Sequence, residues 1–538
     1  MSAPYHLEII VLLLVAVLIL MTLARRVMIP YPILLVLGGL ALSLVPNVPV
    51  VRLDPDLVFL VFLPPVLWAA AYFTSLRDFA GNLRPIVLLA VGLVVVTTGA
   101  VAVAARLIIP GMSWPVAFAL GAIVSPPDAV AATAIARRLR IPHRLVTILE
   151  GESLINDAAA LVLYRVSVVI AVSGGTITVG AGLLEFAMAA LGGVLVGLVV
   201  GLATRWALRF TDDSLGQIAI TLLAPYAAWV IGERTHVSAV LACVVGGLYV
   251  RQAFSSVVPP VTRIQARAVW DLLLFILNGL IFILIGLQLG AIRASGMIDD
   301  LGVLLLQGAV VSVAAIVVRL VWVPLATLVP RWASRSLRRR DPIPPAGHVF
   351  LVAWTGMRGI VSLAAALALP LDFPHRDEVI LLTFSVILST LVVQGLSLTP
   401  LIRWLHLGHD DSLELEEAFA REAAARAALG QLEAVDERAT AREEVERLRA
   451  SYTQRVERST PISLGEGSDA ARARAARRRL RHDLLTAERR ALIDLRDRGV
   501  ISDEVLHRLE QELDVEAIRL GLGETRLDGG PGPPSSVA

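Results

Sequence analysis

Three acidic side chains lie inside two long apolar runs of this sequence, and a short arginine-rich turn joins the two runs. Asp128 lies in the first run, and Glu152 and Asp157 lie in the second. A carboxylate buried in hydrocarbon is costly, so we interpret such residues as functional. Asp128 precedes Arg138 by ten residues, and Asp157 follows Arg144 by thirteen. At about 1.5 Å per helical residue, both carboxylates lie roughly 15–20 Å from the turn, at one level.

The second run surrounds its aspartate with further oxygen ligands. Ser153 and Asp157 are four residues apart and share a helix face, and Glu152 and Asn156 share the neighbouring face. Carboxylate, hydroxyl and amide oxygens are hard ligands, which suit an alkali cation and suit zinc or copper poorly. Polar contact between helices is the structural alternative, because membrane bundles also use it. Two acids at matched depth favour an ion site.

The first run contains its own helix break. Pro126 and Pro127 lack amide donors, so backbone carbonyls at 123–125 are left without helical partners. Irregular backbone in a membrane is tolerated where it lines a cavity or is buried in protein, and unwound helices commonly form ion sites in secondary transporters. A simple proline kink is the alternative. Asp128, directly after the two prolines, favours an ion site.

A second interruption occurs in the apolar run 354–370, where Gly356 and Gly359 flank Arg358. A guanidinium at this depth is always charged and needs an acidic partner. We expect that partner to be Glu152, because the other two buried acids then stay free for a cation.

Two further arginines fall inside apolar runs. Arg319 lies in a run near 300–330, and Arg165 lies in a run near 145–172. Long basic side chains can bury their stems in lipid and extend the charged group to the interface. We expect both arginines to snorkel in this way.

The runs that carry these residues belong to a chain that is mostly apolar. Of its 538 residues 56% are hydrophobic, and apolar runs of eighteen or more residues recur as far as Leu407. This argues against a large soluble enzyme and predicts an all-α polytopic membrane protein. We predict thirteen transmembrane helices, near 7–24, 30–46, 56–73, 84–109, 115–138, 145–172, 177–208, 214–233, 236–251, 269–292, 300–330, 347–370 and 377–405.

The basic residues of the loops predict the orientation of these helices. All basic residues other than histidine are arginine, because the sequence contains no lysine. Alternate loops of the predicted topology carry eighteen arginines, whereas the opposite loops carry five. The positive-inside rule then places the N-terminus outside and the C-terminus in the cytoplasm, in a plasma membrane. The two interrupted helices are seven positions apart, an odd offset that predicts inverted repeats.

The composition changes abruptly after Leu407. Residues 408–538 are charged and alanine-rich, with apolar residues at helical spacing, and we predict a cytoplasmic helical tail. A break is expected near 459–469. A second helix is expected to follow it and to end near Arg498, and a third helix is expected after Ser502. Disorder is expected after about residue 525, where glycine and proline dominate. The tail is either a packing or dimerisation module or a regulatory sensor.

Several segments resemble the sodium/proton exchanger family, in particular the bacterial form of its electroneutral monovalent cation:proton antiporter branch. GESLINDAAALVLY at 151–164 is similar to the Asn-Asp signature of that branch, and WTGMRGIVSLAAALALP at 354–370 is similar to its arginine-bearing helix. Further similar segments are FLPPVLWAAAY at 62–72, SAVLACVVGGLYV at 238–250 and LNGLIFILIGLQL at 277–289. The resemblance covers about residues 1–407.

The resemblance implies a fold with two domains. A core bundle, about 84–172 and 300–407, would contain two broken, crossing helices and would move against a dimerisation domain, about 1–83 and 173–299. The expected partners are therefore a second copy of the chain, the lipid bilayer, alkali cations and protons. No nucleic acid and no cofactor besides the transported Na⁺ and H⁺ are expected.

The resemblance also implies roles for the site residues. Asp157 would be the Na⁺ ligand and proton carrier, and Asp128 would support it at the helix crossing. Ser153 and Asn156 would be ligands or would orient the site. Because the usual threonine is replaced here, a backbone carbonyl at Pro127 could serve as a ligand.

A second departure affects the third predicted helix. Ala69 and Ala70 stand after Leu-Pro-Pro, where many family members have an acid, so cation preference stays open.

The sequence thus predicts a secondary transporter, not an enzyme, which exchanges Na⁺ or another alkali cation for H⁺ by competition for Asp157. One charge moved in each direction would make the exchange electroneutral. The transporter would have roles in pH and sodium homeostasis. Three alternatives are K⁺/H⁺ exchange, electrogenic exchange and a gated cation channel. A membrane-embedded hydrolase is more remote, because no histidine shares the depth of Ser153.

Overall fold

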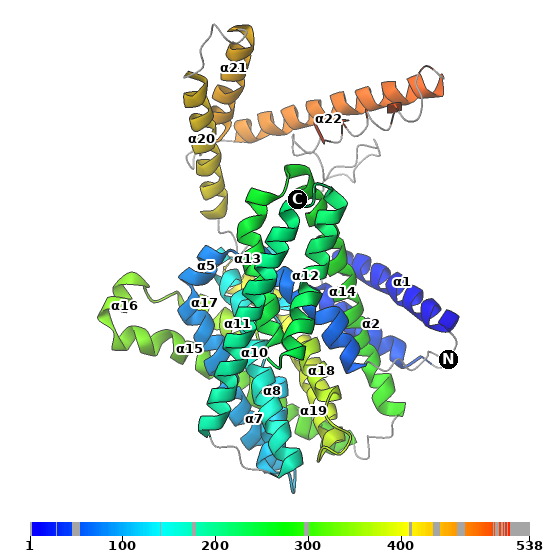
Figure 1. The fold of residues 1–538 in the computed structure, drawn as a ribbon, viewed down its shortest axis with the longest axis vertical. Coiled ribbons are helices and arrows are strands. Elements are labelled where there is room, and N and C mark those ends of the chain that lie inside the picture. The colour runs from blue at the N-terminus through cyan, green and yellow to red at the C-terminus, as the bar shows by residue number, and fades with distance from the viewer. Residues whose placement is uncertain are drawn as a thin grey trace. The chain divides into compact units, whose positions relative to one another are not determined.

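A computed structural model of the chain is almost entirely helical (Figure 1). It describes residues 3–27, 30–45, 54–139, 141–174, 179–294, 301–407, 412–433, 442–459, 468–498 and 500, with isolated positions between 505 and 516. These residues contain no β-strand, which confirms the predicted all-α class. The chain divides into two compact units, Met1–Asp410 and Asp411–Ala538.

The first half of the larger unit contains the first interrupted helix. Its helices are α1 (Ala3–Val27), α2 (Tyr31–Ser43), α3 (Pro55–Leu57), the π-helical turn η1 (Val58–Phe62), α4 (Leu63–Phe73), α5 (Leu76–Gly81), α6 (Leu83–Val87), η2 (Leu88–Leu93), α7 (Val94–Ile108), α8 (Trp114–Val124), α9 (Ala129–Arg138) and α10 (His143–Ser173).

The second half contains long spans and the second interrupted helix. Its helices are α11 (Val179–Arg209), α12 (Ser214–Arg234), α13 (Ala239–Val257), α14 (Pro260–Ala294), α15 (Leu301–Ala333), α16 (Arg335–Arg340), α17 (Ala346–Trp354), α18 (Ile360–Leu367) and α19 (Arg376–Trp404).

The described helices include many that could cross a membrane. Nine helical segments are long and apolar enough for a full crossing, and three shorter apolar helices lie at Val11–Ala24, Tyr31–Ser43 and Ala239–Gln252. The interrupted pair α17 and α18 adds one further apolar segment. A polytopic membrane protein is therefore confirmed, whereas the number thirteen and the inverted repeats stay predictions.

Both interruptions fall where the sequence predicts them. Between α8 and α9 the chain passes through Pro126 and Pro127, and between α17 and α18 it passes through the extended segment 355–359. Helix α8 packs against α7, α10 and α18, and α18 packs against α19, as Figure 1 shows for these neighbouring ribbons. The two breaks therefore lie within one packed group of helices.

The smaller unit contains three described helices. Helices α20 (Ser412–Glu433) and α21 (Arg442–Ser459) pack against each other, and α22 spans Ser468–Asp497. Ala425 and Val445 are buried in this unit. The predicted third helix after Ser502 and the predicted disorder after residue 525 lie largely or wholly outside the described residues.

Helices α2 and α14 cross at unusually short range. A methyl group added at Gly39 would lie 2.2 Å from the carbonyl oxygen of Ile283, and one added at Gly286 would lie 2.2 Å from that of Val36. Small residues at such crossings let two membrane helices pack backbone against backbone. The crossing fixes α2 beside α14.

We expect Gly286→Ala to lower the free energy of unfolding by about 1–3 kcal/mol, because the added methyl group forces the two backbones apart. Gly99→Ala is the matched control, since nothing lies within 4 Å of a methyl group added to this helical glycine. Melting midpoints of the purified variants in detergent test the prediction. Equal midpoints for the two variants would contradict the close crossing.

Candidate functional site

Two of the three predicted buried acids lie at a cavity of about 490 Å³. Asp128, Ser153 and Asp157 line it, together with Tyr31 of α2 and Asn278 of α14. Pro127 also lines it, so the structure brings together four of the predicted site residues from α10 and the break between α8 and α9. Tyr31 and Asn278 come from elements assigned to the other predicted domain.

The cavity reaches the side of the bundle that carries the arginine-rich loops. Arg251 near the end of α13 and Arg267 near the start of α14 line it at that side, and the predicted topology places both in one arginine-rich loop. Asp157 retains 7% of its surface exposed. No hydrogen bond joins its carboxylate to another of the described residues, whereas Asp128 and Asn156 each make a hydrogen bond to the backbone.

Asp128 is held by backbone on both sides of the crossing. Its amide donates to the Met357 carbonyl oxygen (2.7 Å), and its Oδ1 accepts a hydrogen bond from the Val130 amide (2.8 Å). The second contact caps the first turn of α9, a usual role of aspartate. A methyl group added at Gly359 would lie 2.0 Å from Asp128 Oδ2, so only glycine lets the second broken segment approach this closely.

Asn156 links α10 to the broken segment. Its Nδ2 donates to the Pro127 carbonyl oxygen over 2.9 Å, and its Oδ1 is buried with no hydrogen-bond partner among the described residues. A carbonyl oxygen has two lone pairs, so the one at Pro127 can still accept a further ligand. Asn156 therefore orients the broken segment beside Asp157.

Arg358 does not make the predicted salt bridge with Glu152. Its Nε donates to the Val124 carbonyl oxygen (2.8 Å), Nη1 donates to the Gly356 carbonyl oxygen, and its amide donates to Thr390 Oγ1 (3.2 Å). Val124 ends α8, where unpaired carbonyls carry partial negative charge. Arg358 is only 1% exposed. Its positive charge is compensated by the partial negative charge at the C-terminus of α8 and not by a carboxylate that it hydrogen-bonds.

The actual partner of Glu152 is Arg319, so the predicted snorkelling of Arg319 is wrong. Arg319 Nη2 lies 2.8 Å from Glu152 Oε2, Nη1 donates to Oε1, and Nη2 also donates to the Val352 carbonyl oxygen (3.0 Å). Both side chains are almost fully buried. The bidentate pair joins α10, α15 and α17. Arg319 lies fourteen residues before the end of α15, too deep to reach an interface.

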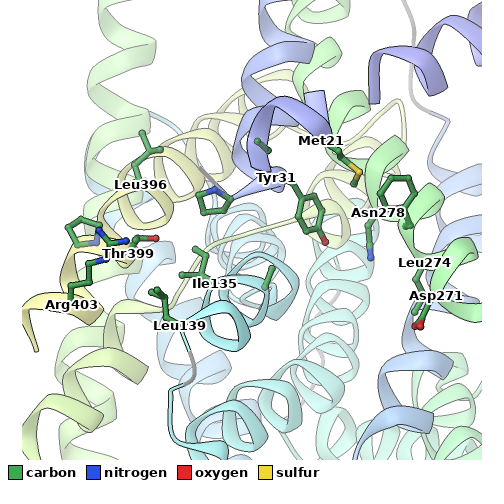
Figure 2. A pocket seen from close by; sticks show the side chains of 15 residues that line it. Met21, Tyr31, Ile135, Leu139, Asp271, Leu274, Asn278, Leu396, Thr399 and Arg403 are labelled. Atoms are coloured by element: carbon green, nitrogen blue, oxygen red, sulfur yellow. The ribbon is translucent and has the colours of Figure 1, made fainter. Parts of the chain in front are cut away.

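A second cavity of about 580 Å³ adjoins the first, since both are lined by Tyr31, Asp271, Leu274 and Asn278. Figure 2 shows Met21 and Asn278 on one side of it and Leu139 and Thr399 on the other. The first two residues come from α1 and α14, and the last two come from the end of α9 and from α19. The predicted dimerisation elements and the predicted core therefore face each other across open space.

Sequence reasoning missed several residues of the site. Gly359 was noted as a helix breaker, but its close approach to Asp128 depends on how two distant segments cross. Tyr31 and Asn278 carry no signal in the sequence beyond being polar in apolar runs. The depth of Arg319 in its apolar run could have indicated a buried acidic partner, because the same reasoning led us to expect such a partner for Arg358.

The candidate cation ligands of the cavity, which are the side chains of Asp157 and Ser153 and the Pro127 carbonyl, offer oxygen atoms. Carboxylate, hydroxyl and carbonyl groups can replace the hydration shell of an alkali cation. Among the described residues, no group of three or more histidine, cysteine or acidic side chains could hold a metal ion as a resident cofactor. The site can therefore accommodate a proton or a weakly held cation at a carboxylate.

Two interrupted helices that cross beside buried carboxylates, within a bundle of apolar spans, define a membrane transporter. The profile described as "Sodium/hydrogen exchanger, transmembrane" matches residues 11–404. The chain belongs to the sodium/hydrogen exchanger family. The resemblance inferred from the motifs at 151–164 and 354–370 is thereby confirmed.

Individual relatives agree with this assignment. An uncharacterized Na(+)/H(+) exchanger of Mycobacterium tuberculosis is 35% identical over 535 residues, covering 96% of each chain. The low-affinity Na(+)/H(+) antiporter NhaS1 of Synechocystis is 33% identical and covers 81% of this chain and 82% of its own. The structure of the sodium proton antiporter MjNhaP1 from Methanocaldococcus jannaschii matches with a TM-score of 0.58 at 19% identity, over 76% of this chain and 100% of that one. The predicted antiporter fold is confirmed.

We expect Arg319→Ala to destabilise the protein by about 3–5 kcal/mol, because it leaves the Glu152 carboxylate buried and unpaired. The double variant Arg319→Met, Glu152→Met should recover most of that loss, since it removes both charges. Melting midpoints in detergent measure both effects. Arg209→Ala, at an exposed arginine of α11, is the control. A normal midpoint for Arg319→Ala would contradict the ion pair.

Proposed function

We propose that this protein exchanges Na⁺ for H⁺ across the plasma membrane, one for one, through competition at Asp157. The proposal is supported by the position of that carboxylate and by its hydrogen bonding. The carboxylate faces a cavity that is open toward the arginine-rich side, and it accepts no hydrogen bond from a described residue. Asp128 beside it is engaged in capping α9, so the two acids have different roles.

Competition for one group couples the two fluxes. A proton and a cation cannot both neutralise the Asp157 carboxylate, so each must leave before the other binds. Asn156 stands where a second acid would allow a second proton, and its amide is instead bonded to Pro127. This arrangement favours electroneutral exchange over the electrogenic alternative. The products of such exchange would serve pH and sodium homeostasis.

Alternating access requires one group of helices to move past another. We assign 84–172 and 300–407 to the moving core, and 1–83 and 173–299 to a dimerisation domain shared by two copies of the chain. The 580 Å³ cavity lies between α1, α2 and α14 on one side and α9 and α19 on the other, and together with the ion cavity it supplies room for that motion. Arg165 of α10 and Glu233 of α12 form an ion pair (3.0 Å) between the same two groups.

The types of residue in the cavity do not determine which alkali cation is transported, so a transport assay has to identify it. Na⁺, Li⁺ and K⁺ all accept carboxylate, hydroxyl and carbonyl oxygens, and their ranking depends on the size and rigidity of the cavity. Ala69 and Ala70 line that cavity and contribute no further charge. We favour Na⁺ because the relatives reported above are named for Na⁺/H⁺ exchange.

We expect Asp157→Asn to abolish cation-dependent proton flux while the melting midpoint stays near that of the parent, because the amide can bind neither ion competitively. The measurement uses proteoliposomes with a trapped pH dye and successive steps of Na⁺, Li⁺ and K⁺. Asp212→Asn, at an exposed acid in a loop, should transport like the parent.

Three outcomes would contradict different parts of the proposal. Exchange retained by Asp157→Asn would refute the role of this carboxylate. Cation flux without a pH change would indicate a channel. A parent rate that depends on a clamped membrane voltage would refute electroneutral exchange and favour the electrogenic alternative.

A further prediction concerns the direction in which the cavities open. Ala134 of α9 lines both cavities, and the single cysteine, Cys243, is fully buried. We expect a cysteine at Ala134 to react with a membrane-impermeant thiol reagent from the arginine-rich side, which the positive-inside rule predicts to be cytoplasmic. The measurement compares inside-out with right-side-out vesicles. Reaction only from the opposite side would contradict the predicted orientation.

A further inference from the structure

A third cavity, of about 410 Å³, lies inside the proposed core and shares no lining residue with the ion cavity. It lies between α6, η2, α10, α15 and α17. Arg84, Arg144 and Arg331 line it at the helix ends that the arginine-rich loops join. The transport mechanism uses none of these three residues.

One carboxylate serves all three arginines. Asp341 Oδ1 accepts from Arg144 Nη2 (2.8 Å), and Oδ2 accepts from Arg331 Nη2 (2.6 Å). Arg84 Nη1 lies 3.8 Å from Oδ2, outside hydrogen-bond range, and it is buried with no hydrogen-bond partner among the described residues. Three guanidinium groups against one carboxylate leave an excess of two positive charges and an unused donor. The cluster therefore has the excess positive charge and the free donor to bind a further anion.

The wall below this cluster is apolar. Leu88, Val323, Ala326 and Val349 line the cavity, and Val352 lies at the level of the buried ion pair, because its carbonyl accepts from Arg319. From Arg331 to Val323 is eight residues of helix, or about 12 Å. A charged rim above an apolar crevice of this depth matches a molecule with an anionic head and a hydrocarbon chain.

The same end of α15 exposes apolar and aromatic side chains. Val329 is 48% exposed and Trp332 is 65% exposed. Exposed tryptophan at the end of a membrane helix is typical of the headgroup level. The cluster of three arginines therefore lies at the height of lipid phosphates.

We propose that this crevice binds an anionic phospholipid, with the phosphate among Arg84, Arg144 and Arg331 and one acyl chain along the apolar wall. A zwitterionic lipid would leave the excess charge uncompensated, and a free phosphate would leave the apolar wall empty. The predicted location is the cytoplasmic leaflet, where acidic lipids attract arginine. The bound chain would reinforce the packing of α10, α15 and α17 near Glu152.

The test uses the full-length protein purified in detergent, with dioleoyl phosphatidylglycerol as the probe and dioleoyl phosphatidylcholine as its zwitterionic counterpart. Native mass spectrometry measures bound lipid, and the melting midpoint measures stabilisation. We expect phosphatidylglycerol to bind and to raise the melting midpoint more than phosphatidylcholine. Arg84→Gln should weaken phosphatidylglycerol binding about fivefold, the effect of one arginine near a lipid surface.

Two further variants make the result specific. Arg209→Gln removes the same charge from an exposed site on α11, remote from the crevice lining, and should bind like the parent. Ala326→Phe fills the crevice and should also weaken binding, although it removes no charge. Excess inorganic phosphate should not displace the lipid.

Each opposite result overturns the proposal. Equal binding of the two lipids would show a non-specific apolar crevice. Equal effects of Arg84→Gln and Arg209→Gln would show that the cluster is not the headgroup site. Parent-like binding by Ala326→Phe, or displacement by inorganic phosphate, would show that no acyl chain occupies the crevice. None of these readouts depends on transport, so they stand apart from the proposed exchange.

Discussion

The structure depends on the way two broken helices satisfy each other's backbone. In a bilayer, an unpaired backbone group cannot turn to water, so an interrupted span must find partners within the protein. Here Arg358 donates to the last carbonyl of α8 at Val124, and the Asp128 amide donates to Met357 on the other broken segment. Each broken segment donates a hydrogen bond to a backbone carbonyl beside the other break. The crossing also holds Asp128 at the cavity.

A second interaction, a buried ion pair, sets one of the three acids apart from the proposed ion site. The Glu152–Arg319 pair consumes the third acid of the region in a buried bidentate contact that joins three helices. Asp128 is engaged in capping α9, and Asp157 alone lines the cavity without a hydrogen bond to a described residue. Three acids that look equivalent in the sequence are thus distinguished by their partners, and of the three only Asp157 accepts no hydrogen bond from a described residue.

Local sequence patterns predicted the all-α class and the positions of both breaks, because these follow from hydropathy and from proline and glycine along the chain. They could not assign the partners of the buried arginines. Arg319 and Arg358 lie in similar apolar runs, and which one meets Glu152 depends on how α15 and α17 pack against α10. The capping of α8 by Arg358 was equally hidden, since its acceptor is a backbone carbonyl more than two hundred residues away.

The central claim is that a sodium ion and a proton take turns on the Asp157 carboxylate. Its most direct test is proton release on sodium binding, measured with the purified protein in a weakly buffered solution at a pH where the site is partly protonated. The account predicts that added Na⁺ releases protons from the parent and none from Asp157→Asn. Radioactive sodium bound by the parent with no release of protons would contradict it.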